Sequence, residues 1–489
     1  MNSQGKNNHR RTSGTSEIEG PKGFVPTPIE VVDLMVGKLF SNRSPNPEKA
    51  ILDPGCGTGN FIAGIIRWCE AHQASVPNIT GIELNPYHVA AAKERFSSYA
   101  SVKIEHGDFL SDHSLKYDYV VGNPPYVPIT GLGAAEKKRY RTTFLTASGR
   151  FDLYLLFFEQ ALRSLNPGGK LVLITPEKFL YVETAAPLRK LLTVTRLEEI
   201  LLLREDTFGD LVTYPTITAL TNSRKSSQTK VVLRDGRTVH VSLPRDGSSW
   251  LPMINGTSSS SDGNKLFEIC RRVSCGVATG ADSIFVKPLS ELEPKFRPFA
   301  FPTLSGRELA VESHMVSPKS CLLIPYARDG SLLGWEELGA LQKYLSDPQI
   351  RHRLMQRTCA TRKVWYAYHE TPVLDEILRP KILCKDITSE PHFWIDRKGT
   401  IVPRHSIYYI VPEDPSMLDE LADYLNSPKA RDWLLAHCQR ASKGFLRIQS
   451  RILKNLPLPQ RLTLSSSRKN ANVRTFAPRI QSTALVAVN

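Results

Sequence analysis

The segment Ile51-Leu52-Asp53-Pro54-Gly55-Cys56-Gly57-Thr58-Gly59-Asn60-Phe61 sets the architecture of the first half of the chain. Glycine has no Cβ, so the backbone can turn sharply after the apolar run and approach a ligand closely. The pattern predicts a strand, a glycine-rich loop and a helix over residues 59–72. The loop lacks the G-x-x-x-x-G-K-[ST] pattern of a phosphate loop, and Asp53 would repel a pyrophosphate. We therefore expect an α/β cofactor pocket whose ligand brings a positive group to Asp53.

Two further acidic residues follow at the ends of the next two apolar runs. Glu83 lies 24 residues after Gly59, and Asp108 precedes Phe109 after the run 102–105. A carboxylate in the first position can accept hydrogen bonds from both ribose hydroxyls, and one in the second can accept from an adenine amine beside an apolar ring. With Asp53, these positions predict a site for S-adenosylmethionine. Taken alone, Asp53 is also compatible with a turn or helix-capping role.

The motif Asn123-Pro124-Pro125-Tyr126 follows a fourth apolar run, residues 117–121, at the edge of the sheet where ligands of open α/β folds bind. Two prolines stiffen the turn and remove two amide donors, which leaves carbonyl acceptors. An exocyclic amine has two N–H donors, so the Asn123 side-chain oxygen and the Pro124 carbonyl can hold both. Tyr126 offers a flat face for an extruded base. The alternative is a proline-bounded turn that simply ends the strand.

These residue types predict methyl transfer to an amine. Such a transfer is an in-line displacement on a positively charged sulfonium, so alignment and acceptor electrostatics supply most of the catalysis and no general base is required. The chain has no Pro-Cys nucleophile of the kind that activates a cytosine ring carbon. That chemistry is therefore disfavoured.

Short apolar runs alternate with amphipathic stretches over residues 24–221, which predicts an α/β, Rossmann-like class I methyltransferase domain with a mixed seven-stranded sheet. A basic hairpin (230–243) and a Gly/Ser/Asn-rich run (255–264) lead to a C-terminal α+β region. The expected strands are residues 50–52, 79–82, 102–105, 117–121, 170–174, 199–203 and 213–221, with helices over 59–72 and 153–165. The expected parts are a disordered basic arm (1–22), a catalytic domain (23–245), a linker (246–264), a second domain (265–459) and a basic tail (460–489).

The charge of the chain favours a polyanionic partner. Lys and Arg number 63 against 48 Asp and Glu, a net charge of +15. No apolar run reaches the roughly 18 residues that would span a bilayer, so nucleic acid is favoured over a membrane, although charge alone is equally compatible with simple solubility. The eight cysteines are scattered without a C-x-x-C pair. This spacing fits reduced thiols in a cytoplasmic protein, and no metal is expected.

Residues 24–221 resemble the catalytic domain of the gamma-class adenine-N6 DNA methyltransferases, the TaqI-type group. Residues 24–35 are similar to the family's N-terminal cofactor motif, and the glycine loop, the ribose acid, the Asp108-Phe109 pair and Asn-Pro-Pro-Tyr follow in the family's order. The resemblance implies catalytic roles for Asn123, Pro124, Pro125 and Tyr126. It implies cofactor-binding roles for Thr27, Pro28, Asp53, Pro54, Gly55, Gly57, Gly59, Glu83, Asp108, Phe109, Asn123 and Phe157.

Two aromatic residues take their expected roles from the same resemblance. Residues 149–159 are similar to the next family motif, in which Phe157 would pack on the cofactor adenine. Phe208 lies where the family places an aromatic that stacks on the flipped adenine opposite Tyr126. Ordinary core packing is the alternative for Phe208.

The similarity also extends to the C-terminal region through residues 276–286, 304–308, 379–382 and 444–447, and implies a DNA target-recognition domain over 265–459. It implies adenine-N6 methylation of a specific site in double-stranded DNA after base flipping, by a monomer associated with the nucleoid. A restriction-modification or related defence system, with a separately encoded endonuclease, follows by analogy. Candidate phosphate contacts, in an expected loop after Asn-Pro-Pro-Tyr, are Lys137, Lys138, Arg139 and Arg141, for which a solvated helix face is the alternative.

Other functions remain open at this stage. Protein-glutamine N5 and ribosomal RNA guanine-N2 methyltransferases carry the same Asn-Pro-Pro-Tyr motif, because their acceptors are also planar amides or amines. Cytosine-N4 methylation is chemically close, although Ser or Asp usually stands there in place of Asn123. A non-catalytic DNA-specificity subunit with the same fold is the alternative from a different class, and the intact acidic positions argue against it.

Overall fold

The computed structural model describes residues 26–41, 45–111, 115–209, 214–223, 228–256, 264–311, 316–441 and 444–462. The expected basic arm, residues 24–25 of the N-terminal motif, residues 257–263 of the expected linker and residues 463–489 of the expected tail lie outside these ranges. The chain divides into two compact units between Gly256 and Thr257. Each unit is described by itself.

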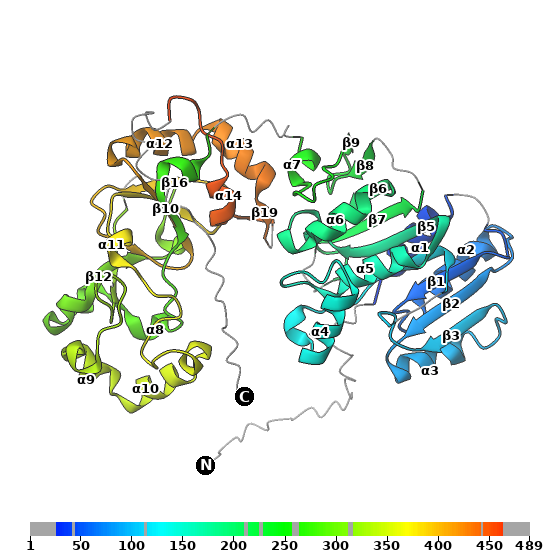
Figure 1. Cartoon of the computed structure of the whole chain (residues 1–489), viewed down its shortest axis with the longest axis horizontal. Helices are drawn as coiled ribbons and strands as arrows, with labels where there is room; N and C mark the ends of the chain where they lie inside the picture. Colours follow the sequence, from blue (N-terminus) through cyan, green and yellow to red (C-terminus); the bar gives the residue numbers. More distant parts are fainter. Residues whose placement is uncertain are drawn as a thin grey trace, which may run out of the picture. The chain divides into compact units, whose positions relative to one another are not determined.

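The first unit is built on a nine-stranded mixed sheet in the order β3-β2-β1-β4-β5-β7-β6-β8-β9 (Figure 1). Strands β1 to β5 pair in parallel, and β7 runs antiparallel between β5 and β6. The strands are β1 Ala50–Pro54, β2 Asn78–Glu83, β3 Val102–His106, β4 Tyr117–Gly122, β5 Leu165–Pro176, β6 Arg196–Leu202, β7 Pro215–Thr221, β8 Thr229–Val232 and β9 Thr238–Val241. The class I methyltransferase fold expected from the sequence is thereby confirmed.

Side chains that alternate along the central strands give the sheet two apolar faces. Val120 of β4 and Leu171 of β5 join one buried cluster, whereas the next residues, Val121 and Val172, join the other. Burial of each such side chain contributes roughly 1.5–3 kcal/mol, so both faces must be covered. The first cluster includes residues of α5 and α6, and the second includes residues of α1, α2 and α3. The helices are α1 Ile29–Phe40, α2 Asn60–Ala71, α3 Pro86–Arg95, α4 Ala134–Thr143, α5 Leu153–Arg163, α6 Ala186–Thr193 and α7 Leu251–Ile254.

The expected count of seven strands was wrong because the basic hairpin is not separate from the sheet. Its first strand, β8, pairs in parallel with β6, and β9 pairs antiparallel with β8. Strand β5 also begins before the expected range 170–174: its pairing with β4 begins at Leu165 and shifts its register before Lys170. Gly168, with φ +77°, accommodates that irregularity.

The first unit also extends past residue 245, where the linker was expected to begin. Trp250 is fully buried, and its ring packs edge-on against Phe179 at 6.2 Å. The buried Arg189 side chain donates hydrogen bonds to the carbonyls of Gly247 and Ser248. Because a buried indole and a buried guanidinium both require these fixed partners, residues up to Gly256 belong to the first unit.

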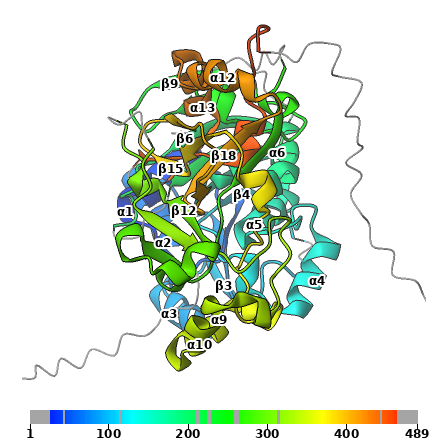
Figure 2. The same cartoon turned by 90° about the vertical axis from the view of Figure 1, so that its left-hand side faces the viewer.

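The second unit is α+β, as expected, and its two four-stranded sheets have the orders β10-β18-β14-β16 and β11-β13-β12-β17, beside a small sheet β15-β20-β19. Helices α9 and α10 lie at one end of this unit, and α12 and α13 at the other (Figure 1 and Figure 2). The strands are β10 Cys270–Cys275, β11 Val286–Pro288, β12 Ala300–Leu304, β13 Ser320–Leu323, β14 Lys381–Lys385, β15 Ile387–Thr388, β16 Phe393–Asp396, β17 Val402–Pro403, β18 Ile407–Pro412, β19 Gln439–Arg440 and β20 Leu446–Arg447. The helices are α8 Asp282–Phe285, α9 Ala340–Leu345, α10 Pro348–Met355, α11 Leu374–Ile377, α12 Leu418–Leu425, α13 Pro428–His437 and α14 Ser450–Lys454.

A buried ion pair crosses from β14 to β16 in the second unit. Lys381 Nζ lies 2.6 Å from Asp396 Oδ2, and both side chains are almost wholly excluded from solvent. The Asp396 carboxylate also accepts hydrogen bonds from the amides of Gly399 and Ile401. Lys381 belongs to the motif 379–382, so this part of the family resemblance corresponds to a structural contact. In the part of the chain that is described, no helix has the length and apolar character needed to cross a membrane.

Candidate active site

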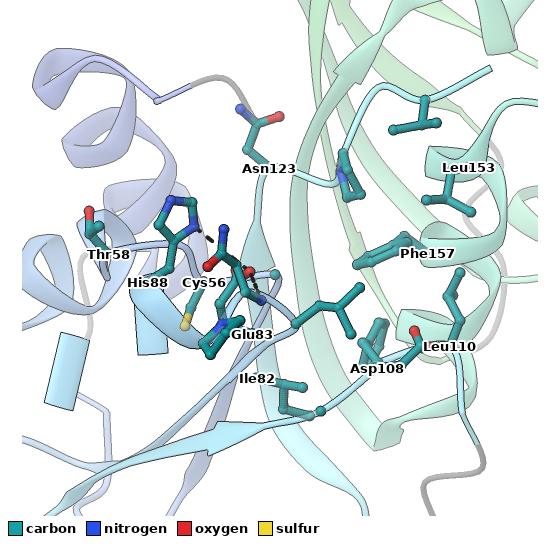
Figure 3. Close-up of a pocket in the computed structure, with 18 of the residues that line it drawn as sticks. Cys56, Thr58, Ile82, Glu83, His88, Asp108, Leu110, Asn123, Leu153 and Phe157 are labelled. Atoms are coloured by element: carbon teal, nitrogen blue, oxygen red, sulfur yellow. Dashed lines mark hydrogen bonds and ion pairs between the residues drawn. The ribbon is translucent and has the colours of Figure 1, made fainter. Parts of the chain in front are cut away.

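A cavity of about 590 Å³ lies at the carboxyl ends of β1, β2, β3 and β4. Loops that follow these four strands supply most of its wall, and Figure 3 shows Asn123 and Asp108 at different ends of it. Parallel strands bring their carboxyl ends to one edge of the sheet, so residues far apart in sequence meet there. A volume of this size suits a small-molecule cofactor.

The glycine loop between β1 and α2 has the backbone conformation that its sequence predicted. Gly55, Gly57 and Gly59 have φ values of +74°, +55° and +86°. A Cβ on Gly59 would lie 2.3 Å from the Phe96 ring, so a larger residue is excluded by both conformation and space. The loop can therefore pass close to the cavity without side chains filling it.

Glu83, at the end of β2, is held between the glycine loop and α3. Its Oε2 accepts a hydrogen bond from the Gly57 amide at 2.8 Å, and its Oε1 accepts one from the Asn85 amide at 2.8 Å. His88 Nδ1 lies 3.8 Å from Oε1 (Figure 3). A carboxylate has about four acceptor positions, so a fixed Glu83 can still accept from a ribose hydroxyl.

Asp53, the fourth residue of β1, is completely buried. Neither of its carboxylate oxygens has a hydrogen-bond partner among the residues that the structure describes. Burial, with a smaller contribution from the charge of Glu83, raises the pKa of Asp53 well above its ordinary value of 3.8. Burial therefore disfavours the ionised form of Asp53 until a cationic group approaches it.

The end of the cavity away from Asn123 is apolar and has one carboxylate, that of Asp108 (Figure 3). The Phe109 and Phe157 rings lie 5.4 Å apart, tilted by 49°, and both line the cavity. Asp108 Oδ1 accepts from the Leu110 amide at 2.9 Å, and Oδ2 accepts from Arg139 at 2.8 Å. Two aromatic rings beside a carboxylate can hold an adenine ring and its amine.

The Asn-Pro-Pro-Tyr turn meets the cavity through Asn123 and Pro125. The side-chain nitrogen of Asn123 donates to Thr27 Oγ1 at 3.1 Å, which leaves Oδ1 as the acceptor of this amide. Tyr126 packs on the core cluster beside α5, and its hydroxyl is buried without a partner among the described residues. Burial raises the pKa of the Tyr126 phenol, so it stays protonated at neutral pH.

The structure brings eight of the predicted site residues to the cavity wall: Thr27, Gly55, Glu83, Asp108, Phe109, Asn123, Pro125 and Phe157. The other residues predicted to bind the cofactor or the target base lie outside that wall: Pro28, Asp53, Pro54, Gly57, Gly59, Pro124, Tyr126 and Phe208. Pro28 is the N-cap of α1. Phe208 is half-buried and packs on the cluster that holds α1 and α2. Its stacking role stays a prediction.

The four candidate phosphate contacts do not lie in a loop, because residues 134–143 form helix α4. Arg139 is engaged by Asp108, and the Arg141 side chain reaches the Gly149 carbonyl at 3.5 Å. Lys138 is exposed and Lys137 is partly buried. The Glu136 carboxylate accepts from the Gly133 amide and so caps the start of the helix.

Sequence reasoning missed several residues of the cavity wall. His88 follows the helix start at Asn85-Pro86, so a β2–α3 junction in the sequence could have indicated it. The stretch after Asn-Pro-Pro-Tyr, which comprises the 3₁₀ turn Ile129–Gly131 and helix α4, brings Leu132, Glu136 and Tyr140 to the wall. Their contribution depends on how this stretch folds back across the sheet edge, for which the sequence carries no local signal.

The open sheet, its glycine loop and the carboxylates at the ends of β1, β2 and β3 have the arrangement of the class I S-adenosylmethionine-dependent methyltransferase fold. The Eco57I restriction-modification methylase family model matches residues 82–208. The Type II methyltransferase M.PaeR7I of Pseudomonas aeruginosa is 27% identical over 504 residues, which cover 90% of this chain and 86% of that protein. M.XhoI of Xanthomonas vasicola is 25% identical and covers 90% of this chain and 91% of its own length.

A solved structure supports the fold over most of the chain. The Type IIL restriction-modification enzyme MmeI, in complex with DNA, matches with a TM-score of 0.61 at 13% identity over 88% of this chain and 65% of that one. The family model and the sequence relatives confirm the resemblance to DNA methyltransferases, and the likeness to MmeI shows the fold alone.

The residues present fit S-adenosylmethionine, the cofactor of this class. The observation that tests the fit is the lining of the cavity, where the Glu83 and Asp108 carboxylates can accept from hydroxyls and an amine beside the Phe109 and Phe157 rings. Asp53 lies outside this wall, and its buried carboxylate, whose oxygens have no partner in the described part of the chain, is the candidate for the amino end of the cofactor. Among the described residues, no group of three or more His, Cys, Asp or Glu side chains is arranged to hold a metal ion.

Proposed function

We propose that this protein is a site-specific DNA methyltransferase that transfers a methyl group to the N6 amine of adenine in double-stranded DNA. The observation that carries the proposal is the position of Asn123: it lies on the wall of the cofactor cavity, and its amide nitrogen is bound to Thr27. In this orientation, the side-chain oxygen Oδ1 is the end of the amide that can accept. An acceptor at the end of β4 can hold an exocyclic amine beside the cofactor.

The chain's own residues then supply binding and alignment. When bound, the cofactor supplies an electrophilic methyl group on a sulfonium. Asp53 would hold the amino end, Glu83 the ribose hydroxyls, and Asp108 with Phe109 and Phe157 the adenine. Asn123 and the Pro124 carbonyl would accept the two amine hydrogens of the target base, which increases electron density on its nitrogen.

Two observations favour DNA as the acceptor. The relatives that cover most of the chain are named Type II methyltransferases, and the MmeI structure with a similar fold contains DNA. The net charge of +15 provides cations for phosphate neutralisation. Extrusion of the base requires a few kcal/mol, which contacts of both units with the duplex would supply. The monomeric state, a nucleoid-associated location and a separately encoded endonuclease stay predictions.

The proposal is tested by incubation of the full chain with radiolabelled cofactor and, separately, plasmid DNA, total RNA and a mixed protein extract. We expect label in DNA alone. Asn123→Ala serves as the control for adventitious methylation, because it removes the acceptor and leaves the Asp53 and Glu83 contacts in place. Label in RNA or protein, with none in DNA, would overturn the proposal and favour the glutamine or guanine enzymes that share this motif.

A further inference from the structure

Helix α4 and the 3₁₀ turn before it (Ile129–Gly131) form part of the cofactor cavity. This segment contributes Gly131, Leu132, Glu136 and Tyr140 to the wall. Before α4, the Ile129 amide donates to the Phe151 carbonyl at 3.1 Å. The helix itself is polar and buries Tyr140 alone of its ten residues.

The chain after α4 is anchored more firmly than α4 itself. The amides of Leu145 and Thr146 donate to the buried Glu159 carboxylate at 3.1 Å and 2.8 Å. Glu159 also pairs with Arg163, whose guanidinium lies over the Phe144 ring. The ends of the segment are therefore fixed to α5 and its neighbours. Few apolar contacts hold α4 against the cavity between them, so polar contacts decide its position.

Arg139 makes a polar contact that joins α4 to Asp108 on the wall of the cavity. Its guanidinium donates to Asp108 Oδ2 at 2.8 Å and to the Tyr140 hydroxyl at 3.1 Å, and it lies 4.8 Å from the centre of the Tyr140 ring. The Asp108 carboxylate is thus held from two sides, by the Leu110 amide and by Arg139. Both Asp108 and Tyr140 line the cavity.

We propose that Arg139 is a positioning residue for the cofactor: it fixes the Asp108 carboxylate and holds α4 over the adenine end of the cavity. The inference rests on the proposed contact between Asp108 and the cofactor's adenine amine. It separates Arg139 in role from Lys137 and Lys138 on the same helix. Without Arg139, the carboxylate can reorient, and α4 keeps Tyr140 as its main contact with the cavity.

The test measures the binding of S-adenosylhomocysteine to the full chain without DNA, by calorimetry and stopped-flow dissociation. We expect Arg139→Gln to raise Kd about fivefold and to accelerate dissociation, the effect of one partly exposed ion pair and a loosened cover. Arg237→Gln is the matched control: Arg237 pairs with Asp235 at 2.7 Å in the β8–β9 turn, at the far edge of the sheet, and its loss should leave Kd unchanged.

A second ligand distinguishes positioning from general damage. The purine analogue of S-adenosylhomocysteine has a hydrogen atom in place of the exocyclic amine and no N1–H, so its base cannot donate to Asp108 from this edge. We expect Arg139→Gln to change the Kd of this analogue less than twofold. In the Asp108→Asn background, we expect the same substitution to change the Kd of S-adenosylhomocysteine less than twofold as well. An equal loss for both ligands, or no loss for either, would overturn the inference.

The outcome for Asp108→Asn alone keeps the inference and the proposed function distinguishable. If Asp108→Asn weakens the adenosyl ligand but Arg139→Gln does not, the positioning role is wrong and the adenine contact stands. If Asp108→Asn leaves Kd unchanged, the adenine contact is wrong and the inference fails with it. Neither result bears on DNA methylation, which the labelled acceptors test separately.

Discussion

At the scale of single residues, the cofactor site depends on carboxylates whose environments differ sharply. Glu83 and Asp108 are already held by backbone amides or by Arg139, so they are ready to accept further hydrogen bonds. Asp53 is fully buried and its oxygens have no partner in the described structure. In the apo protein, burial therefore disfavours the ionised form of Asp53, and the cationic end of the cofactor would favour it.

This account predicts opposite effects of Asp53→Asn on stability and on binding. Unfolded Asp53 titrates near 3.8, and burial with the charge of Glu83 raises its pKa in the folded apo state. The folded state thus binds the proton more tightly, so the free energy of unfolding falls as pH rises from 3.8 toward the raised pKa and then stays low. Asp53→Asn should remove this loss, and Tm should rise by about 2–4 °C for each kcal/mol of unfolding free energy that is regained.

The same substitution should weaken S-adenosylmethionine binding about 10- to 100-fold, because a charge-assisted contact is lost. Wild-type binding should also release a proton below the raised pKa, since the ammonium favours ionised Asp53. Calorimetry in two buffers with different ionisation enthalpies measures that release. A stability difference that is the same at every pH from 4 to 8, or binding without proton release over that range, would contradict the assignment.

Asn123 gives the second prediction at this scale. Asn123→Ala should lower the rate of methyl transfer about 10²- to 10³-fold, because one acceptor of the target amine is lost. Cofactor affinity should change less than threefold, because the carboxylate contacts remain. Single-turnover rates and equilibrium binding separate the two effects. Near-normal transfer by this variant would show that Asn123 does not hold the amine.

At the scale of elements, most of the first unit was readable from sequence because its signals are local. Apolar runs before glycines and acids predicted β1 to β4, and the amphipathic pattern predicted α2 and α5. The hairpin β8–β9 was recognised, but its addition to the sheet was not, because strand pairing at an edge depends on distant partners. Helix α4 was expected as a loop, since its mostly charged sequence has no apolar stripe.

The end of the first unit provides a stability prediction. Trp250 precedes α7 and is fully buried against Phe179, in a stretch that composition alone assigned to a linker. Trp250→Ala should destabilise the first unit by about 3–5 kcal/mol through loss of apolar burial and creation of a cavity. Denaturant unfolding measures this loss. A change in the unfolding free energy below about 1 kcal/mol would indicate that residues 246–256 belong to the linker after all.

The basic residues of α4 provide a prediction on DNA binding. Lys138 is exposed, whereas Arg139 is engaged by Asp108. If Lys138 contacts a phosphate, Lys138→Gln should reduce the slope of log K against log salt by about 1. Fluorescence anisotropy with a labelled duplex measures this slope between 50 and 200 mM salt. Over this range, the affinity of a DNA-binding protein can fall by roughly 10³- to 10⁵-fold. An unchanged slope would show that Lys138 makes no phosphate contact and lies on a solvated helix face.

At the scale of the whole molecule, the first unit could be predicted in more detail than the second. The proposed cofactor contacts come from motifs of fixed order, which place Asn123, Glu83 and Asp108 on one cavity. In the second unit, a matched motif such as 379–382 contains Lys381, which serves a buried ion pair. Residues that read bases are defined by the surface of a folded domain and by the sequence that it meets, so one chain does not reveal them.

The most direct test of the central claim, that the acceptor held at the end of β4 is the N6 amine of adenine, is the identity of the methylated base. Plasmid DNA treated with the enzyme and S-adenosylmethionine is hydrolysed to nucleosides for mass spectrometry, and a second portion is sequenced by long reads. We expect N6-methyladenine, confined to one short sequence and absent with Asn123→Ala. N4-methylcytosine, 5-methylcytosine or unmodified DNA from an enzyme that binds its cofactor would contradict the account.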